Sequence, residues 1–156
     1  EMGARVAELY YDRAMELKSD YPFKGNMNIE KLEELILAEG KENIPYIRME
    51  AGTNLIGGQP ISYENMKAAT ELAKSFVILT VLDASLLQDN LYFIKTREES
   101  MKDKSIREIT RMIGDLFDVI YFSGRKFGFG RGGCVLIRDL EMFRSMEDRV
   151  TILPDF

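Results

Sequence analysis

Apolar residues follow helical spacing in the clearest segment of the chain, between residues 28 and 39. They recur every three or four positions, which is the spacing of one helix face: Ile29, Leu32, Leu35 and Ile36. Asn28 stands where a helix cap is favoured, and Gly40 stands where a helix often ends in a left-handed backbone. The pattern therefore predicts a helix from Asn28 to Glu39.

Strand and helix patterns alternate from this helix to the end of the chain. We predict strands over residues 44–51, 76–82, 119–122 and 134–138, and helices over residues 62–75, 85–99, 105–116 and from 139 onward. Ser62 caps the second helix, and Ser105 with Glu108 forms a capping box. This order predicts an α/β fold with a mostly parallel sheet flanked by helices, whose ligand groups collect at the carboxyl ends of the strands.

The first twenty residues carry an ambiguous pattern. Their apolar positions fit either a helix or a short strand followed by a helix: Val6, Leu9, Tyr10, Ala14 and Leu17. We favour a short strand over residues 6–9 and then a helix.

Length and composition narrow the classes of function. The 156 residues, 46% of them hydrophobic, suffice for one domain over residues 1–156. The longest apolar run, residues 76–82, is far shorter than the roughly 20 residues of a membrane span. The net charge of −5 opposes broad attraction to nucleic acid or anionic membranes. We expect no membrane or nucleic-acid partner, and a small molecule or a protein instead.

The titratable side chains limit the chemistry further. The chain has no histidine and a single cysteine, Cys134. Histidine-based catalysis, zinc clusters and an intrachain disulfide are therefore excluded, and we expect no metal site. A reducing, cytoplasmic location is the default, and acid–base work falls to lysine, tyrosine, cysteine or carboxylates.

Three polar residues stand at loops where ligands gather. Lys126 follows a strand within a glycine-rich loop and could attack a carbonyl if partly desolvated near Arg125 and Arg131. A solvated surface lysine is the plainer interpretation. Asp83 ends an apolar strand, where it could cap a helix or pair with a pyridinium nitrogen. Asn54 lies before a Gly-Gly turn and could be an ordinary loop residue or a hydrogen-bond donor.

The glycine-rich loop also has features of arginine-glycine RNA-binding segments. Residues 127–133 read FGFGRGG, with aromatic rings that could stack on bases. One short basic loop in an acidic chain argues against this function.

Five ordered motifs, spread over nearly the whole chain, resemble tryptophanase and tyrosine phenol-lyase. These are residues 22–26 (PFKGN), Asn54 with 57–62 (GGQPIS), 83–85 (DAS), 90–95 (NLYFIK) with 97–99 (REE), and 123–126 (SGRK) with 132–133 (GG). Five motifs in order are hard to obtain by chance.

The resemblance implies fold type I of the pyridoxal-phosphate enzymes, in which the lysine loop joins a parallel strand to a returning antiparallel one. It implies pyridoxal 5'-phosphate as cofactor, linked covalently to Lys126. Asp83 would face the pyridine nitrogen, Asn54 the phenolic oxygen and Ser123 the phosphate. The implied activity is β-elimination of tryptophan or tyrosine to pyruvate, ammonia and the aromatic leaving group.

The chain departs from this family in three respects. Leu86 stands where the family has an arginine that reaches the cofactor, and Arg125 replaces a second lysine. Residues 127–131 replace a stretch that contributes to a monovalent-cation site. The phosphate-cradling loop, the stacking aromatic and the residues that bind the substrate fall outside the chain.

We therefore expect a fragment of a larger lyase domain that is completed by the rest of a polypeptide or by other subunits, as a homo-oligomer acting on an amino acid. Two alternatives stay open. One is a related pyridoxal-phosphate lyase or aldolase for another amino acid. The other is a non-catalytic domain used for protein interaction.

Overall fold

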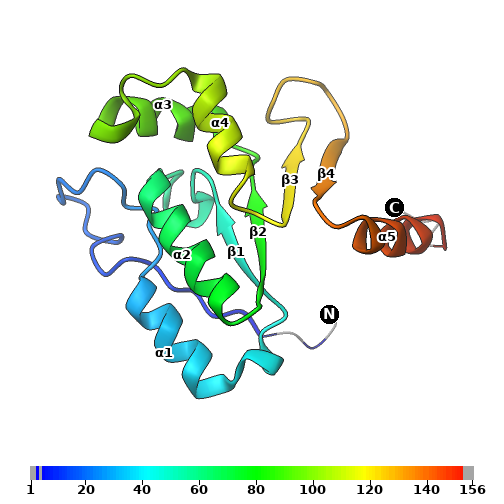
Figure 1. The fold of residues 1–156 in the computed structure, drawn as a ribbon. Helices are drawn as coiled ribbons and strands as arrows, with labels where there is room; N and C mark the ends of the chain where they lie inside the picture. Colours follow the sequence, from blue (N-terminus) through cyan, green and yellow to red (C-terminus); the bar gives the residue numbers. More distant parts are fainter. Residues whose placement is uncertain (1–2, 4, 153–156) are drawn as a thin grey trace.

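The computed structural model describes residue 3 and residues 5–152, with side chains described up to residue 147. Within these residues, four strands form one sheet (Figure 1): β1 (Tyr46–Glu50), β2 (Leu79–Asp83), β3 (Val119–Ser123) and β4 (Gly133–Ile137). The described residues also form five α-helices: α1 (Ile29–Glu39), α2 (Tyr63–Ser75), α3 (Leu87–Arg97), α4 (Ile106–Gly114) and α5 (Leu140–Ile152). The predicted α/β class is confirmed.

The sheet has the order β1-β2-β3-β4. β1, β2 and β3 are parallel, and β4 returns antiparallel to β3. The arrangement expected of fold type I, a parallel strand joined through the lysine loop to an antiparallel one, is confirmed. The register places Glu50 beside Asp83 and Asp83 beside Tyr121, so the three side chains share one face of the sheet.

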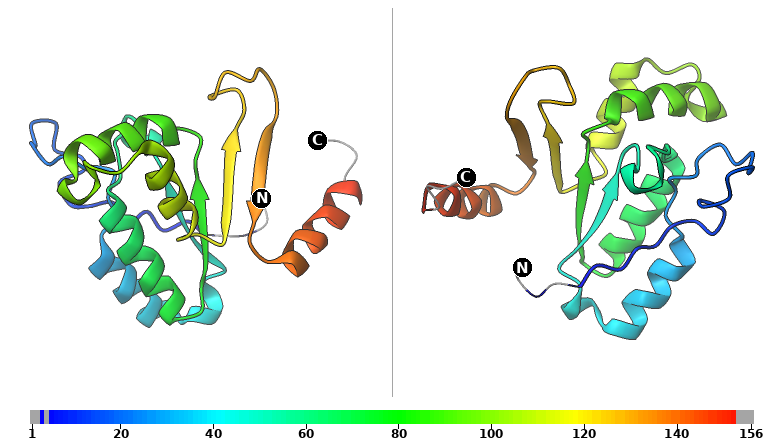
Figure 2. Two further views of the ribbon diagram at one scale, coloured as in Figure 1. Left: turned by 45° about the horizontal axis from the view of Figure 1, so that its top comes forward. Right: turned by 180° about the vertical axis from the view of Figure 1, so that it is seen from behind.

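The two faces of β1 differ sharply. Ile47 and Met49 are buried, whereas Tyr46 and Arg48 are exposed. The buried face packs against a core that α1 and α2 share, through residues such as Leu32, Ile36, Met66 and Ala73. Both helices lie on the same side of the sheet, and α5 lies beyond β4 (Figure 2). The opposite face of β1, here called the open face, carries Tyr46, Arg48 and Glu50.

The predicted helix ends hold to within a few residues. Asn28 and Ser62 accept hydrogen bonds from the backbones of α1 and α2 as expected, and the capping box of Ser105 and Glu108 is present. These caps satisfy amides that would otherwise lack partners at a helix start.

The strand predicted over residues 76–82 begins later, at Leu79. Phe76 ends α2, and Val77 has a left-handed backbone with φ of 60°. The Val77 and Ile78 amides donate to the carbonyls of Lys74 and Ala73, which is a Schellman ending. Phe76, Val77 and Ile78, which were predicted to begin the strand, therefore form the end of α2.

The helix predicted after residue 9 is wrong, and so is the strand over residues 6–9, although the next residue, Tyr10, forms an isolated bridge with Met27. Leu17 and Met15 are exposed, and Ala14 is buried. The apolar positions do not meet a common core, so helical spacing brings no burial to stabilise a helix there.

Candidate functional site

Three loops meet the same edge of the sheet, because β1, β2 and β3 are parallel and their carboxyl ends point the same way (Figure 1). Asn54 lies in the loop after β1, Asp83 is the last residue of β2, and Ser123 ends β3 before the loop of Lys126. The topology thus gathers all four predicted site residues at one edge, although the outermost two, Asn54 and Lys126, are 72 positions apart in the sequence.

Asp83 is buried, with 8% of its surface exposed. Its Oδ1 accepts a hydrogen bond of 3.0 Å from the Ser85 amide, so it does stabilise the turn that leads into α3. Its Oδ2 lies 3.7 Å from Nη1 of Arg48. A buried carboxylate needs such partners, because an unpaired charge away from water is costly. Asp83 therefore stabilises the turn before α3 and also faces the Arg48 guanidinium on the open face.

Arg48 connects the charged groups of the open face. Its Nη1 donates a hydrogen bond of 2.8 Å to Oη of Tyr121, and its Nη2 lies 3.7 Å from Oε2 of Glu50. Burial alone would lower the pKa of the guanidinium, but the hydrogen bond to Tyr121 and the charges of Glu50 and Asp83 raise the pKa overall. Arg48 is therefore firmly cationic.

Tyr121 responds to the same surroundings. Burial is the main reason that the pKa of its hydroxyl is raised, the hydrogen bond from Arg48 opposes this, and the charge of Asp83 adds to it. The phenol is therefore neutral near pH 7. Arg48, Glu50 and Tyr121 were not singled out from the sequence. The period-two alternation of β1, which puts Arg48 and Glu50 on one face, was the available signal.

Asn54 lies in a short 3₁₀ turn, Asn54–Ile56, and is exposed. Its Nδ2 donates to Oε1 of Glu50 at 3.1 Å, which links it to the charged groups of β1. Gly57 and Gly58 follow with φ of 84° and 73°, a left-handed backbone that glycine adopts without strain. The predicted loop is confirmed, and it carries Asn54 beside Glu50.

Buried Asn90 of α3 fixes both ends of this loop. Its Oδ1 accepts from the amides of Gly52 and Ile61, and its Nδ2 donates to the carbonyl of Ile61. These bonds satisfy backbone groups that are shut away from water. The position of Asn54 is thereby tied to α3.

Ser123 and Lys126 differ in how firmly they are held. The Ser123 amide donates to Oγ of Ser85 at 3.1 Å, which joins the end of β3 to the turn after β2. Lys126 is exposed, and its backbone carbonyl accepts from Nε2 of Gln88. The rings of Phe122, Phe127 and Phe129 contact one another along the loop. The described residues do not bury the lysine amine, so the expected desolvation is not supplied by them.

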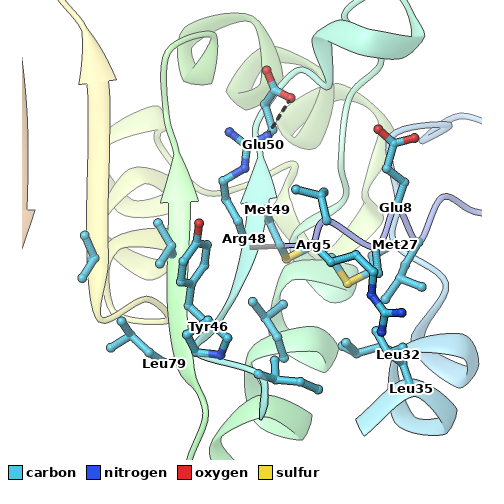
Figure 3. Close-up of a pocket in the computed structure, with 18 of the residues that line it drawn as sticks. Arg5, Glu8, Met27, Leu32, Leu35, Tyr46, Arg48, Met49, Glu50 and Leu79 are labelled. Carbon is cyan, nitrogen blue, oxygen red and sulfur yellow. Dashed lines mark ion pairs between the residues drawn. The ribbon is translucent and has the colours of Figure 1, made fainter. Parts of the chain in front are cut away.

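An open pocket of about 930 Å³ lies along β1 and is lined by residues 5–10, by α1 and by both faces of that strand. Figure 3 shows Arg48 and Glu50 projecting from β1 with their charged ends together. Tyr121 also lines this pocket, but Asn54, Asp83, Ser123 and Lys126 do not. The pocket therefore includes Arg48, Glu50 and Tyr121 of the charged group, whereas the four predicted site residues lie at the carboxyl edge outside it.

Comparison with known proteins identifies the family. Residues 2–147 match the family described as beta-eliminating lyase. The chain belongs to the beta-eliminating lyase family. It is 38% identical over 151 residues to a tyrosine phenol-lyase of Clostridium tetani, covering 96% of this chain and 33% of that protein. It is 36% identical over 147 residues to a tryptophanase of Haemophilus influenzae, covering 94% of this chain and 30% of that protein.

The chain thus spans about a third of the length of these relatives. Among solved structures, mouse CSAD is similar with a TM-score of 0.49 and 18% identity, covering 74% of this chain and 22% of that one. Within the described residues, none of the helices has the length and apolar character needed to cross a membrane. The resemblance drawn from the five motifs is confirmed by the family match.

Leu86, where the family resemblance places an arginine, packs against the loop of Asn54. A Cβ added at Gly52, which has φ of 72°, would come within 2.9 Å of Cβ of Leu86. The departure from the family is therefore accommodated by a close apolar contact between the loop after β1 and the start of α3.

Proposed function

We propose that this chain forms the lysine-bearing half of a pyridoxal-phosphate-dependent active site that eliminates the β-substituent of an aromatic amino acid. The observation that carries the proposal is the placement of buried Asp83 at the carboxyl edge of a parallel sheet, between the loops of Asn54 and Lys126. Membership of the beta-eliminating lyase family supports the same function.

The donor set fits the cofactor group by group. A buried carboxylate suits a pyridinium N–H, a serine hydroxyl beside backbone amides suits a phosphate, and a primary amine suits an aldehyde. Asp83, Ser123 and Lys126 supply these groups, and Asn54 supplies an amide for the phenolic oxygen. All four come from one edge of the sheet, so one small molecule can contact loops from three strands.

The cofactor, when bound, supplies an electron sink for negative charge at Cα of the substrate. Asp83 holds the proton at the pyridine nitrogen and so maintains that sink. Lys126 would take the proton from Cα, and the bond from Cβ to the aromatic group would break as an acid outside these residues gives a proton to the leaving group. Pyruvate and ammonia follow by hydrolysis, which requires no histidine. The aromatic amino acid is tyrosine or tryptophan, as the names of the relatives suggest.

Segments beyond these residues complete the site in this proposal. They would supply the phosphate cradle, the ring that stacks on the cofactor and the arginine for the substrate carboxylate. They would also cover Lys126, whose amine is exposed. We place the enzyme in the cytoplasm as a homo-oligomer, because the family resemblance implies sites built between subunits.

Covalent labelling tests the proposal. The chain is incubated with pyridoxal phosphate, reduced with borohydride and digested, and the modified peptide is mapped by mass spectrometry. We expect the label at Lys126, and a weaker label in Asp83→Asn. Lys41 and Lys74, which precede β1 and β2 and so lie toward the opposite, amino ends of these strands, serve as internal controls. Labelling spread evenly over surface lysines would contradict the proposal and favour a non-catalytic domain.

A further inference from the structure

Glu50 and Asp83 place two carboxylates on neighbouring strands of the open face. They are register partners in the parallel pair β1–β2, so their side chains project from the same side of the sheet. Like charges directly opposite one another in a sheet are destabilising. The two acids therefore need a cation between them if Asp83 is to keep its place.

Arg48 supplies that cation. It precedes Glu50 by two residues on β1 and so projects from the same face. Its two terminal nitrogens divide between the acids, with Nη1 3.7 Å from Asp83 and Nη2 3.7 Å from Glu50. Its hydrogen bond to Tyr121 of β3 fixes the guanidinium from the third strand. The group is thus anchored across three strands.

The charges add to one negative unit. Glu50 and Asp83 contribute two negative charges and Arg48 one positive charge, while Tyr121 is neutral. Glu50 is tied further by the Asn54 amide, which donates to Oε1 at 3.1 Å. Asp83 is tied by the Ser85 amide. One guanidinium therefore offsets one carboxylate and leaves a single negative charge at the carboxyl edge.

We propose that Arg48 is a positioning residue, paired with Glu50, that leaves the charge of Asp83 directed at the pyridine nitrogen of the cofactor. This inference rests on the proposed function, because it assigns the charge of Asp83 to that nitrogen. Removing Arg48 would bring two uncompensated carboxylates together. Removing Glu50 would leave Arg48 to neutralise Asp83 alone. Removing both would restore the single negative charge.

A nitrogen-specific binding measurement tests this proposal. Affinities are measured for pyridoxal phosphate and for its 1-deaza analogue, in which carbon replaces the ring nitrogen, and their ratio is the readout. We expect the chain to prefer pyridoxal phosphate. Arg48→Met should reduce that preference about fivefold, the upper range for a partly exposed ion pair. Glu50→Gln should also reduce it, and the double variant R48M/E50Q should restore it.

Two further variants separate charge balance from a loss of fold. Arg48→Lys keeps the charge and should retain most of the preference. Arg107→Met removes an exposed arginine of α4 that does not line the pocket along β1, and should leave the preference unchanged. Circular dichroism on each variant reports folding.

The outcomes are distinct. If the chain shows no preference for pyridoxal phosphate and Asp83→Asn changes nothing, the proposed function itself fails. If the chain has the preference and Asp83→Asn abolishes it, but Arg48→Met keeps it, only the role of Arg48 is overturned. Equal losses for both ligands in Arg48→Met, without rescue in the double variant, would mean that Arg48 is merely structural.

Discussion

Val77 shows how a single residue can override a local pattern. Its neighbours are apolar enough to predict a strand, yet its φ of 60° ends α2 in a Schellman motif. Among the described residues, no other non-glycine residue has a positive φ. A β-branched side chain is poorly suited to this conformation. With 85% of its surface exposed, Val77 gains little from packing to offset the strain.

Val77→Gly should therefore stabilise the chain. The left-handed conformation costs an L-residue about 1–2 kcal/mol, which glycine would avoid. Glycine also makes the unfolded chain more flexible, and this entropy offsets only part of the gain in stability. We expect the free energy of unfolding in urea to rise by up to about 1 kcal/mol. Val77→Ala retains Cβ and should gain less. A loss of stability in Val77→Gly would contradict the assigned strain.

At the scale of elements, the start of α2 depends on a residue from beyond α3. Glu98 accepts hydrogen bonds from the amides of Tyr63, at 2.7 Å, and Glu64, at 3.1 Å. Together with the Ser62 cap, it satisfies amides that α2 cannot pair within itself. Burial is the main influence on the pKa of Glu98 and raises it above the ordinary value of 4.5, although these amides oppose the shift.

This raised pKa predicts the pH dependence of stability. A carboxyl whose pKa is higher in the folded state adds most to the free energy of unfolding when it is protonated, below its unfolded pKa. This contribution is lost as the pH rises through the folded pKa. The unfolding free energy of the chain, relative to Glu98→Gln, should therefore fall as pH rises from below 4.5 and then level off. Urea titrations between pH 3 and 7 measure this difference. A relative stability that rises over this range would contradict the prediction.

At the scale of the whole molecule, the sheet has one face packed on helices and an open face that carries charged residues and the pocket along β1. The core joins α1 and α2 to the sheet through Leu32, Ile36 and Met66, whereas the lysine loop and β4 lie at the other end, with exposed Phe129, Val135 and Leu136. The carboxyl edge of the sheet therefore joins a well-packed region to a sparsely packed one.

Cofactor binding should stabilise the whole chain through this edge. A ligand that binds only the folded state adds about 2.7 kcal/mol when its concentration is 100 times its Kd. Pyridoxal phosphate at that excess should raise the melting temperature measured by calorimetry. The shift should be smaller in Asp83→Asn and Lys126→Ala at the same concentration, since both remove proposed contacts. An equal shift in all three proteins would point to binding elsewhere.

The sequence by itself determined the alternation of helices and strands after residue 28, the helix caps and the family, because these depend on local spacing and on motifs that are continuous in the chain. It also predicted Asn54, Asp83, Ser123 and Lys126 as a group, through the resemblance. The strand order places the segments that carry them at one edge, since parallel strands align their carboxyl ends.

The contacts of Arg48 depend on the tertiary structure alone. Its partners Asp83 and Tyr121 lie 35 and 73 positions away in the sequence, and only strand order and register bring them together. The conformations of residues 5–20 and of Val77 also depend on the tertiary structure. Apolar spacing shows which residues could share a face, but it does not show whether other elements pack against that face and bury it. Helix and strand patterns depend on residues that are close in the sequence, whereas burial and charge pairing depend on residues that are far apart in it.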